Sequence, residues 1–220
     1  MSRHSHRNPY LLVLYQKYLK DQETGGFIRK AAECYSQGTL QRLAEHDGRL
    51  VRRAAVLALG FLADYEANPT LGKALQDEDR TVRTSADNAI RNVWTRAGTE
   101  EHQQQLQAIL RLNLAQHFQE AIRRATELLD SVPWFAEIWN QRAIAHFALG
   151  HYREAVHDCH QTLEINPYHF AAAAGMGQAQ LQLGDHAAAL ESFRRALRLN
   201  PDLEAVRVQI ARLTRRIEGR

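Results

Sequence analysis

Cysteine is scarce and long apolar runs are absent in this sequence of 220 residues. The two cysteines, Cys34 and Cys159, lie far apart, so they make no disulfide framework and indicate a reducing compartment, the cytoplasm. No apolar run reaches the roughly 18 residues needed to span a bilayer, so no membrane association is expected. The apolar stretch at 10–15 is short and is followed by Lys17 with no small-residue cleavage site, so no signal peptide is expected.

The sequence also lacks the motifs of enzymes and of metal or cofactor sites. It contains no Gly-rich phosphate loop, and no Ser or Cys stands in a nucleophile motif beside a placed base. The densest group of potential ligands is His157, Cys159 and His160. On a helix the two histidines would be one turn apart and exposed, whereas Cys159 shares the register of Phe193 and should point into the core. We therefore expect no metal, no cofactor and no catalytic residues.

The net charge of +3 is unevenly distributed along the chain. Residues 1–98 hold 15 Lys+Arg and 11 Asp+Glu, whereas residues 99–220 hold 13 Arg and 14 Asp+Glu. The last stretch is nevertheless basic. Such a tail is most simply a solvated helix end, where arginine suits the helix dipole, or else it meets an acidic partner or a phosphate backbone. The basic residues of this tail are Arg207, Arg212, Arg215, Arg216 and Arg220.

A repeat with a constant shift of 34 in the numbering organises the second half of the chain. Gly150, Ala155 and Leu163 recur one period later as Gly184, Ala189 and Leu197, and the dipeptide 166–167, Asn-Pro, recurs at 200–201. Part of the pattern is visible one period earlier, at positions 121, 125, 129 and 133. A constant period of this size indicates stacked supersecondary units.

The first half carries a different repeat. Residues 39–62 match residues 70–93 after a shift of 31, and the sequence at 51–55 echoes that at 28–32. We infer three helical hairpins between residues 9 and 97, the first of them degenerate, with Gly38 ending one helix. Neither half shows the alternation of a strand, which predicts an all-α chain.

Arginines recur along this first array and have two interpretations. With Asp47, Asp77 and Asp79 in the preceding turns, they form an Asp–Arg ladder that ties one repeat to the next. Alternatively, they form a basic edge that binds phosphates or nucleic acid. The residues of this edge are Arg49, Arg52, Arg53, Arg80 and Arg83.

The first array resembles the short HEAT-like repeats of the kind found in bilin lyases. The resemblance covers residues 10–97 and rests on an acidic turn, then Val-Arg and two small residues, then Ala-Leu-Gly. Here these are Asp47, the stretch 51–55 and the stretch 58–60, with a second copy from Asp77 to Arg91. The resemblance implies an α-solenoid of stacked hairpins. Trp94 would pack where this array meets the next.

Residues 102–217 resemble the tetratricopeptide family. Trp139, Ala143, Gly150 and Tyr152 match the family pattern in the middle repeat, whereas the first repeat has Gln116 at the glycine position. The expected organisation is a disordered tail (1–8), HEAT-like repeats (9–97), a junction (98–101), three tetratricopeptide repeats (102–203) and a capping helix with a basic tail (204–220).

The tetratricopeptide resemblance implies a concave groove, lined by the first helix of each repeat, that takes a peptide or a helix. Asn140 and Gln178 would pair with a peptide backbone and should be exposed, whereas Leu110 and Phe147 would hold an apolar side chain. Ordinary helix packing is the alternative for Phe147 and Ile144. The lining carried over from the family is Leu106, Leu110, Asn113, Glu137, Asn140, Ile144, Phe147, Ala171, Ala174, Gln178 and Leu181, with Arg207 on the capping helix.

One specialisation of that family does not fit the residues. Members that hold the carboxyl terminus of heat-shock chaperones need Lys and Arg on the first helices, where this chain has Glu137, Asn140, Ala171 and Ala174. A clamp for chaperone tails is therefore not expected. The sequence predicts a non-enzymatic adaptor or scaffold that binds a protein or peptide, with nucleic-acid binding by the basic edge as the alternative. It leaves the oligomeric state open.

Overall fold

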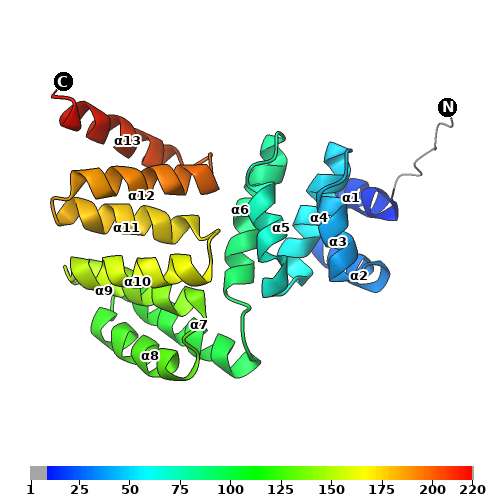
Figure 1. Ribbon diagram of the computed structural model, residues 1–220. Helices are drawn as coiled ribbons and strands as arrows, with labels where there is room; N and C mark the ends of the chain where they lie inside the picture. Colours follow the sequence, from blue (N-terminus) through cyan, green and yellow to red (C-terminus); the bar gives the residue numbers. More distant parts are fainter. Residues whose placement is uncertain (1–8, 220) are drawn as a thin grey trace. The chain divides into compact units, whose positions relative to one another are not determined.

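The computed structural model describes residues 9–219 and is all-α, with no strand in that range (Figure 1). The predicted disordered tail, residues 1–8, and Arg220 lie outside the described residues. The chain divides into two compact units between Val93 and Trp94. Within the described residues, no helix is long and apolar enough to cross a membrane. The predicted α-solenoid of stacked hairpins is confirmed.

The first unit is built from antiparallel helices that follow the repeat of the first half. Helix α3 packs on α4, and α1 packs on α2 and α4. The second helix ends at Cys34, and Gly38 lies inside the first turn of α3. The expectation that Gly38 ends a helix was therefore wrong. Helix α3 begins before Gly38 because Ser36 caps it by accepting the backbone N–H of Thr39. The helices are α1 (Tyr10–Asp21), α2 (Thr24–Cys34), α3 (Gln37–Ala44), α4 (Arg49–Leu62), α5 (Asn68–Ala74) and α6 (Arg80–Trp94), with a 3-10 turn at Tyr65–Ala67.

Small residues bring α4 and α6 close together in this unit. A Cβ atom added at Gly60 would lie 2.9 Å from the Cβ of Ala89, a distance that real side chains do not adopt. Val51, Ala55 and Leu59 of α4 are buried, and so are their counterparts on α6. The close contact between the two helices is therefore at Gly60 and Ala89, and both helices also carry buried apolar residues.

The second unit is a stack of three hairpins and a last helix, with each helix packed on the next from α7 to α13 (Figure 1). Thr99 and His102 form a capping box at the start of α7. The helices are α7 (Glu100–Leu114), α8 (Phe118–Ser131), α9 (Ala136–Ala148), α10 (Tyr152–Ile165), α11 (Phe170–Gln182), α12 (His186–Leu199) and α13 (Glu204–Ile217).

The turns inside the hairpins require left-handed backbone. Gly150 and Gly184 have φ angles of 79° and 80°, and the residue one period before Gly150 is Gln116, with φ 61°. A side chain in this region costs roughly 1 kcal/mol relative to glycine. The first hairpin therefore keeps the geometry of the other turns at an energetic cost.

The last helix occupies the place of a further repeat. Val206 and Leu213 belong to the core cluster of this unit, and Ile210 packs against it. They lie one period after Ala172, Ala179 and Met176, which are buried on α11. Helix α13 thus continues the stack in the same register as a first helix.

Candidate functional site

The predicted groove residues fall on the first helices of the repeats, which are α7, α9 and α11, and on α13. Helix α9 packs on both α7 and α11, so the first helices form one face of the second unit. We call this surface the first-helix face. It consists of Leu110 and Asn113 of α7, Asn140, Ile144 and Phe147 of α9, Gln178 and Leu181 of α11, and the equivalent positions of α13.

Asn140 is buried, which corrects the expectation that it is exposed. Only 7% of its surface is accessible, and its Nδ2 donates to Oε1 of Glu137 at 3.1 Å. Its neighbour Gln141 donates to the same oxygen at 2.6 Å. The register placed Asn140 correctly on a first helix, but a buried carboxylate one turn away holds its amide.

Glu137 is the centre of a buried polar cluster that sequence reasoning missed. Its Oε2 lies 2.8 Å from Nε2 of His169, which is fully buried. Nδ1 of His169 accepts the backbone N–H of Ala172 at 3.0 Å, so the ring proton is on Nε2 and donates to Glu137. Burial raises the pKa of Glu137, but the hydrogen bonds from His169, Gln141 and Asn140 outweigh it and hold that pKa below its usual value.

This cluster fixes the starts of two neighbouring first helices. His169 caps the amino end of α11, and Glu137 lies in the first turn of α9. The ring of Trp94, the first residue of the second unit, stacks on His169 with centroids 3.8 Å apart and lies 5.2 Å from Phe170. The sequence held one indication of this cluster, because Glu137 is a carboxylate at a position where the other repeats have the uncharged residues Gln103 and Ala171.

Asn113 also makes an internal contact between helices. Its Nδ2 donates to the backbone oxygen of Gln141 at 2.9 Å and to the side-chain oxygen of Gln141 at 3.0 Å. The amides of Asn113, Gln141 and Asn140 and the carboxylate of Glu137 therefore form one chain of hydrogen bonds across α7 and α9. Such a network fixes the register of the stack.

Ile144 and Gln178 of the predicted groove remain available to a ligand. The side chain of Ile144 is 45% exposed although it is large and apolar. Gln178 is half-buried and makes no hydrogen bond to any described residue. Leu110 is half-buried, Phe147 packs edge-on against Tyr152 at 5.4 Å, and Leu181 packs on the core. Arg207 is exposed and contacts Glu204 and the carbonyl of Pro201.

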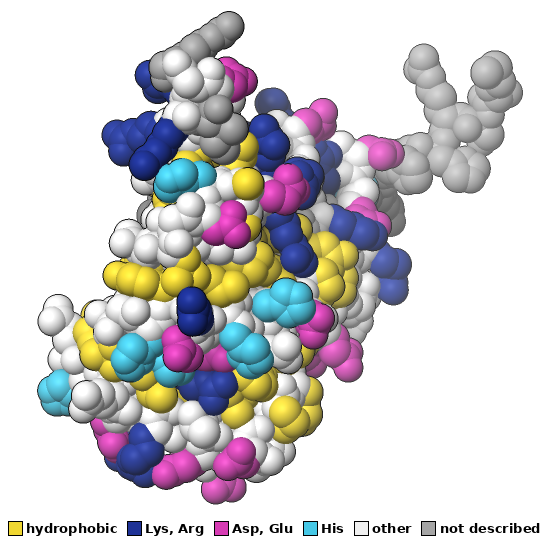
Figure 2. All heavy atoms as spheres, turned by 60° about the vertical axis from the view of Figure 1, so that its left-hand side comes forward, with side chains coloured by type: hydrophobic (Ala, Val, Ile, Leu, Met, Phe, Trp, Pro, Cys, Tyr) yellow, Lys and Arg dark blue, Asp and Glu magenta, His cyan; other side chains and the backbone are white. Residues whose placement is uncertain are grey.

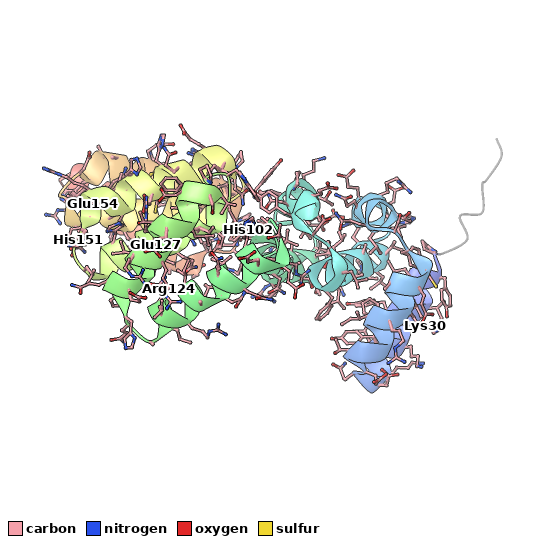
Figure 3. The ribbon with its side chains drawn as sticks, turned by 90° about the horizontal axis from the view of Figure 1, so that it is seen from below. Lys30, His102, Arg124, Glu127, His151 and Glu154 are labelled. Carbon is pink, nitrogen blue, oxygen red and sulfur yellow. The ribbon has the colours of Figure 1, made fainter. Side chains whose placement is uncertain are left out.

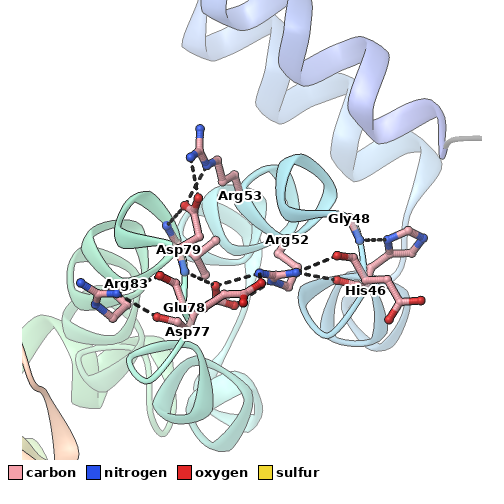
Figure 4. A network of polar contacts seen from close by, with 10 residues as sticks. His46, Gly48, Arg52, Arg53, Asp77, Glu78, Asp79 and Arg83 are labelled. Carbon is pink, nitrogen blue, oxygen red and sulfur yellow. Dashed lines mark hydrogen bonds and ion pairs between the residues drawn. The ribbon is translucent and has the colours of Figure 1, made fainter.

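Arg52 of the alternative basic edge is held by five hydrogen bonds (Figure 4). Its Nε and Nη2 donate to the two carboxylate oxygens of Asp77 at 2.7 and 2.9 Å, and Nη2 also donates to Glu78 at 3.0 Å. Nη1 donates to the carbonyls of His46 and Asp47 at 3.1 and 2.9 Å. All five N–H groups of the guanidinium are therefore satisfied inside the protein.

The other arginines of this edge divide into two groups. Arg53 pairs with both carboxylate oxygens of Asp79, and this bond lowers the pKa of Asp79 to about 2. Arg83 donates to the carbonyls of Asp77 and Glu78, the same contacts that Arg52 makes one repeat earlier. Arg49 and Arg80 are exposed. The predicted Asp–Arg ladder between repeats is confirmed for Arg52, which pairs with Asp77 of the next repeat, whereas the pair between Arg53 and Asp79 was not predicted.

The three potential metal ligands noted in the sequence, His157, Cys159 and His160, do not point to one centre. His157 and His160 are exposed, whereas Cys159 is buried and its pKa is raised to about 12 by that burial, as the helical register predicts. Figure 3 shows Arg124 and Glu127 on α8, and His151 and Glu154 at the start of α10. Among the described residues, no group of three or more His, Cys, Asp or Glu side chains is placed to hold a metal ion.

Two family models match the chain in the predicted order. The model of HEAT repeats matches residues 36–127, and the model of the tetratricopeptide repeat matches residues 140–204. The HEAT match extends through α7 and most of α8, which were predicted to form the first tetratricopeptide repeat. Both families consist of helical hairpins.

Curated relatives match this chain in sequence, and two solved structures share the fold of about half of it. A TPR repeat-containing protein of Rhizobium etli is 29% identical over 66% of this chain and 71% of its own length. The SGT1 homolog of Bos taurus is 37% identical over 37% of this chain, but the match covers only 24% of that protein. One structure with this fold is the first TPR of Spaghetti (RPAP3) bound to HSP90 peptide SRMEEVD, which is 20% identical over 55% of this chain and 96% of that one (TM-score 0.53). Another is the Sgt2 TPR domain from Aspergillus fumigatus, which is 21% identical over 56% of this chain and 82% of that one (TM-score 0.52).

Proposed function

Because the chain carries HEAT repeats followed by tetratricopeptide repeats, we propose that it is a non-enzymatic adaptor that binds an extended segment of another protein on its first-helix face. Its relatives include a protein of the SGT1 type, and a structure with the same fold has a bound peptide. These likenesses support the general role of a protein-binding adaptor. The choice of face and of contact residues rests on the side chains of this chain.

The observation that carries this proposal is the exposure of Ile144. The side-chain amide nitrogens around it on α7 and α9 are already engaged: that of Asn113 donates to Gln141, and those of Asn140 and Gln141 donate to Glu137. Ile144 and Gln178 stand at equivalent positions of consecutive repeats, one period apart. An apolar side chain and a free amide on a rigid surface offer a partner one hydrophobic contact and one pair of backbone hydrogen bonds.

A displayed library of random dodecapeptides, selected against the full chain, tests this assignment. Peptides that bind the wild type should bind Ile144→Asp at least tenfold more weakly, because the apolar contact is replaced by a charge. Leu183→Asp is the matched control: Leu183 is 44% exposed but lies in the turn between α11 and α12. Peptides that bind both variants like the wild type, or a library that yields no binders, would contradict the proposal.

The alternative, phosphate binding by the basic edge, has less support. Arg52 and Arg53 would have to give up bidentate pairs with Asp77 and Asp79 before they could contact a phosphate. Only Arg49 and Arg80 are exposed without that cost. The two functions differ in their salt dependence, since phosphate binding weakens steeply with salt and an apolar contact does not.

A further inference from the structure

We propose that the first-helix face continues onto α13 and ends in a basic pair, Arg212 and Arg215, that binds acidic side chains of the partner segment. This inference rests on the proposed function and specifies its partner. It assigns a ligand to residues that the sequence also allowed to be a solvated helix end. The partner is a protein segment that presents an apolar residue to Ile144 and carboxylates to α13.

The core register determines which side of α13 continues the face. Val206, Ile210 and Leu213 take the core positions of Ala172, Met176 and Ala179, each one period earlier. With this register, Val208 corresponds to Ala174, Arg212 to Gln178 and Arg215 to Leu181. The positions that hold Gln178 and Leu181 on α11 therefore hold two exposed arginines on α13.

These arginines have no carboxylate partner among the described residues. Arg212 makes no hydrogen bond there, and Arg215 donates only to the carbonyl of Ala211 in its own helix, at 3.3 Å. By contrast, Arg142 holds both carboxylate oxygens of Asp158, and Arg123 is paired with Glu120 and Glu127. Figure 2 shows Lys and Arg side chains gathered around the end of the last helix, at the top of the view.

Charge complementarity therefore favours carboxylates as the groups bound here. A guanidinium binds a carboxylate through two parallel hydrogen bonds, and two arginines one turn apart can hold two acidic side chains. The sequence of α13 has one acidic residue, Glu204 in its first turn, and Glu218 follows the end of the helix, so the last turns keep a positive field. Neutral or basic segments would leave this field uncompensated.

The apolar part of the face sets the rest of the recognition. Val208 is 42% exposed and lies one helical turn before Arg212, and Ala174, its counterpart on α11, is half-buried. Neighbouring helices lie about 10 Å apart, and an extended chain advances about 3.3 Å per residue. Helix α13 follows α9 by two repeats, so two such interhelical distances separate them. A partner would therefore place its apolar residue and its acidic residues roughly six positions apart.

The selected dodecapeptides test this directly. Peptides that depend on Ile144 should be enriched in Asp and Glu, and they should bind Arg212→Glu/Arg215→Glu at least tenfold more weakly at low salt. The control, Arg153→Glu/Arg194→Glu, changes the net charge equally at exposed positions of α10 and α12 and should bind like the wild type. Peptides in which Asn and Gln replace Asp and Glu should lose affinity for the wild type to the same extent. Peptides in which Lys replaces Asp and Glu should bind the charge-reversed protein with the affinity that the acidic peptides have for the wild type.

The outcomes separate this inference from the proposed function. Peptides that need Ile144 but show no acidic enrichment, and that bind the charge-reversed protein equally, overturn the inference and leave the adaptor proposal standing. A labelled single-stranded DNA dodecamer that binds through Arg212 and Arg215 more tightly than the acidic peptides also overturns it. If no peptide depends on Ile144, the proposed function fails, and the inference fails with it.

Discussion

Replacing Arg52 by alanine should destabilise the first unit more than any other single change on the basic edge. The side chain of Arg52 is 9% exposed and that of its partner Asp77 is 11% exposed, so little solvent is available to replace the lost contacts. The variant leaves the Asp77 carboxylate without its bidentate partner, and the carbonyls of His46 and Asp47 lose their donors.

The magnitude follows from the cost of a half-broken buried ion pair. Removing one member of such a pair costs about 3–5 kcal/mol, because the remaining charge stays desolvated. Asp77 keeps some contact with water and still accepts the backbone N–H of Asp79, so we expect the lower end, about 3 kcal/mol. Arg52→Lys keeps the charge but loses the bidentate hydrogen bonds to Asp77, and should lower the free energy of unfolding by about half as much.

Urea unfolding of the full chain, followed by circular dichroism, measures this difference as a shift in the midpoint of the transition that belongs to the first unit. Arg49→Ala is the matched control, since Arg49 is exposed on the same helix and should change stability by less than about 0.5 kcal/mol. An Arg52→Ala protein that unfolds like Arg49→Ala would refute the role of Arg52 in stabilising the contact between the two repeats.

Three further perturbations test the packing, the turns and the ion pairs. Gly177→Ala should lower the free energy of unfolding by about 1–3 kcal/mol, because its Cβ would lie 2.8 Å from the ring of Phe193. Gly175→Ala is the control: its Cβ would meet only the Cys159 sulfur, at 3.6 Å, and the variant should be more stable by up to about 1 kcal/mol. Equal effects of the two variants in thermal or urea unfolding would contradict the packing of Gly177 on Phe193. Gln116→Gly should raise stability by about 0.5–1 kcal/mol by relieving its left-handed backbone, and a destabilised variant would show that the turn does not carry this strain. The pKa of Asp79, about 2 in the folded state, lies below its ordinary value of 3.8, so its pair with Arg53 stabilises the fold above about pH 4 and loses that effect as the pH falls toward 2. The stability difference between wild type and Asp79→Asn should therefore shrink over that interval in acid unfolding, and a constant difference would argue against the pair.

The repeats made most of the fold predictable from the sequence. The period of the second half aligned Gly150 with Gly184, and both lie in left-handed turns of the structure. The Asp–Arg ladder expected between repeats of the first half is present as the bond from Arg52 to Asp77. Periodicity succeeds here because each hairpin contacts mainly its neighbours, so local spacing also fixes the tertiary contacts.

The candidate site was less predictable, because periodicity assigns a residue to a face but does not identify its partner. Asn140 lies on the expected helix, yet Glu137 accepts a hydrogen bond from its amide. That carboxylate in turn contacts His169, which lies far along the chain and caps the next first helix. A polar residue on a first helix can equally contact a ligand or complete an internal network. Only the positions of the surrounding side chains distinguish Asn140 from Gln178.

The central claim, that the first-helix face binds a protein segment, is tested most directly by backbone amide chemical shifts of the full chain, titrated with a dodecapeptide selected from the library. The predicted result is a continuous set of shifted amides on α9, α11 and α13 around Ile144, Gln178 and Arg212, with the amides around Arg49 and Arg80 unmoved. Shifts confined to α4 and α6, around Arg49 and Arg80, would contradict the account and move the binding site to the basic edge of the first unit.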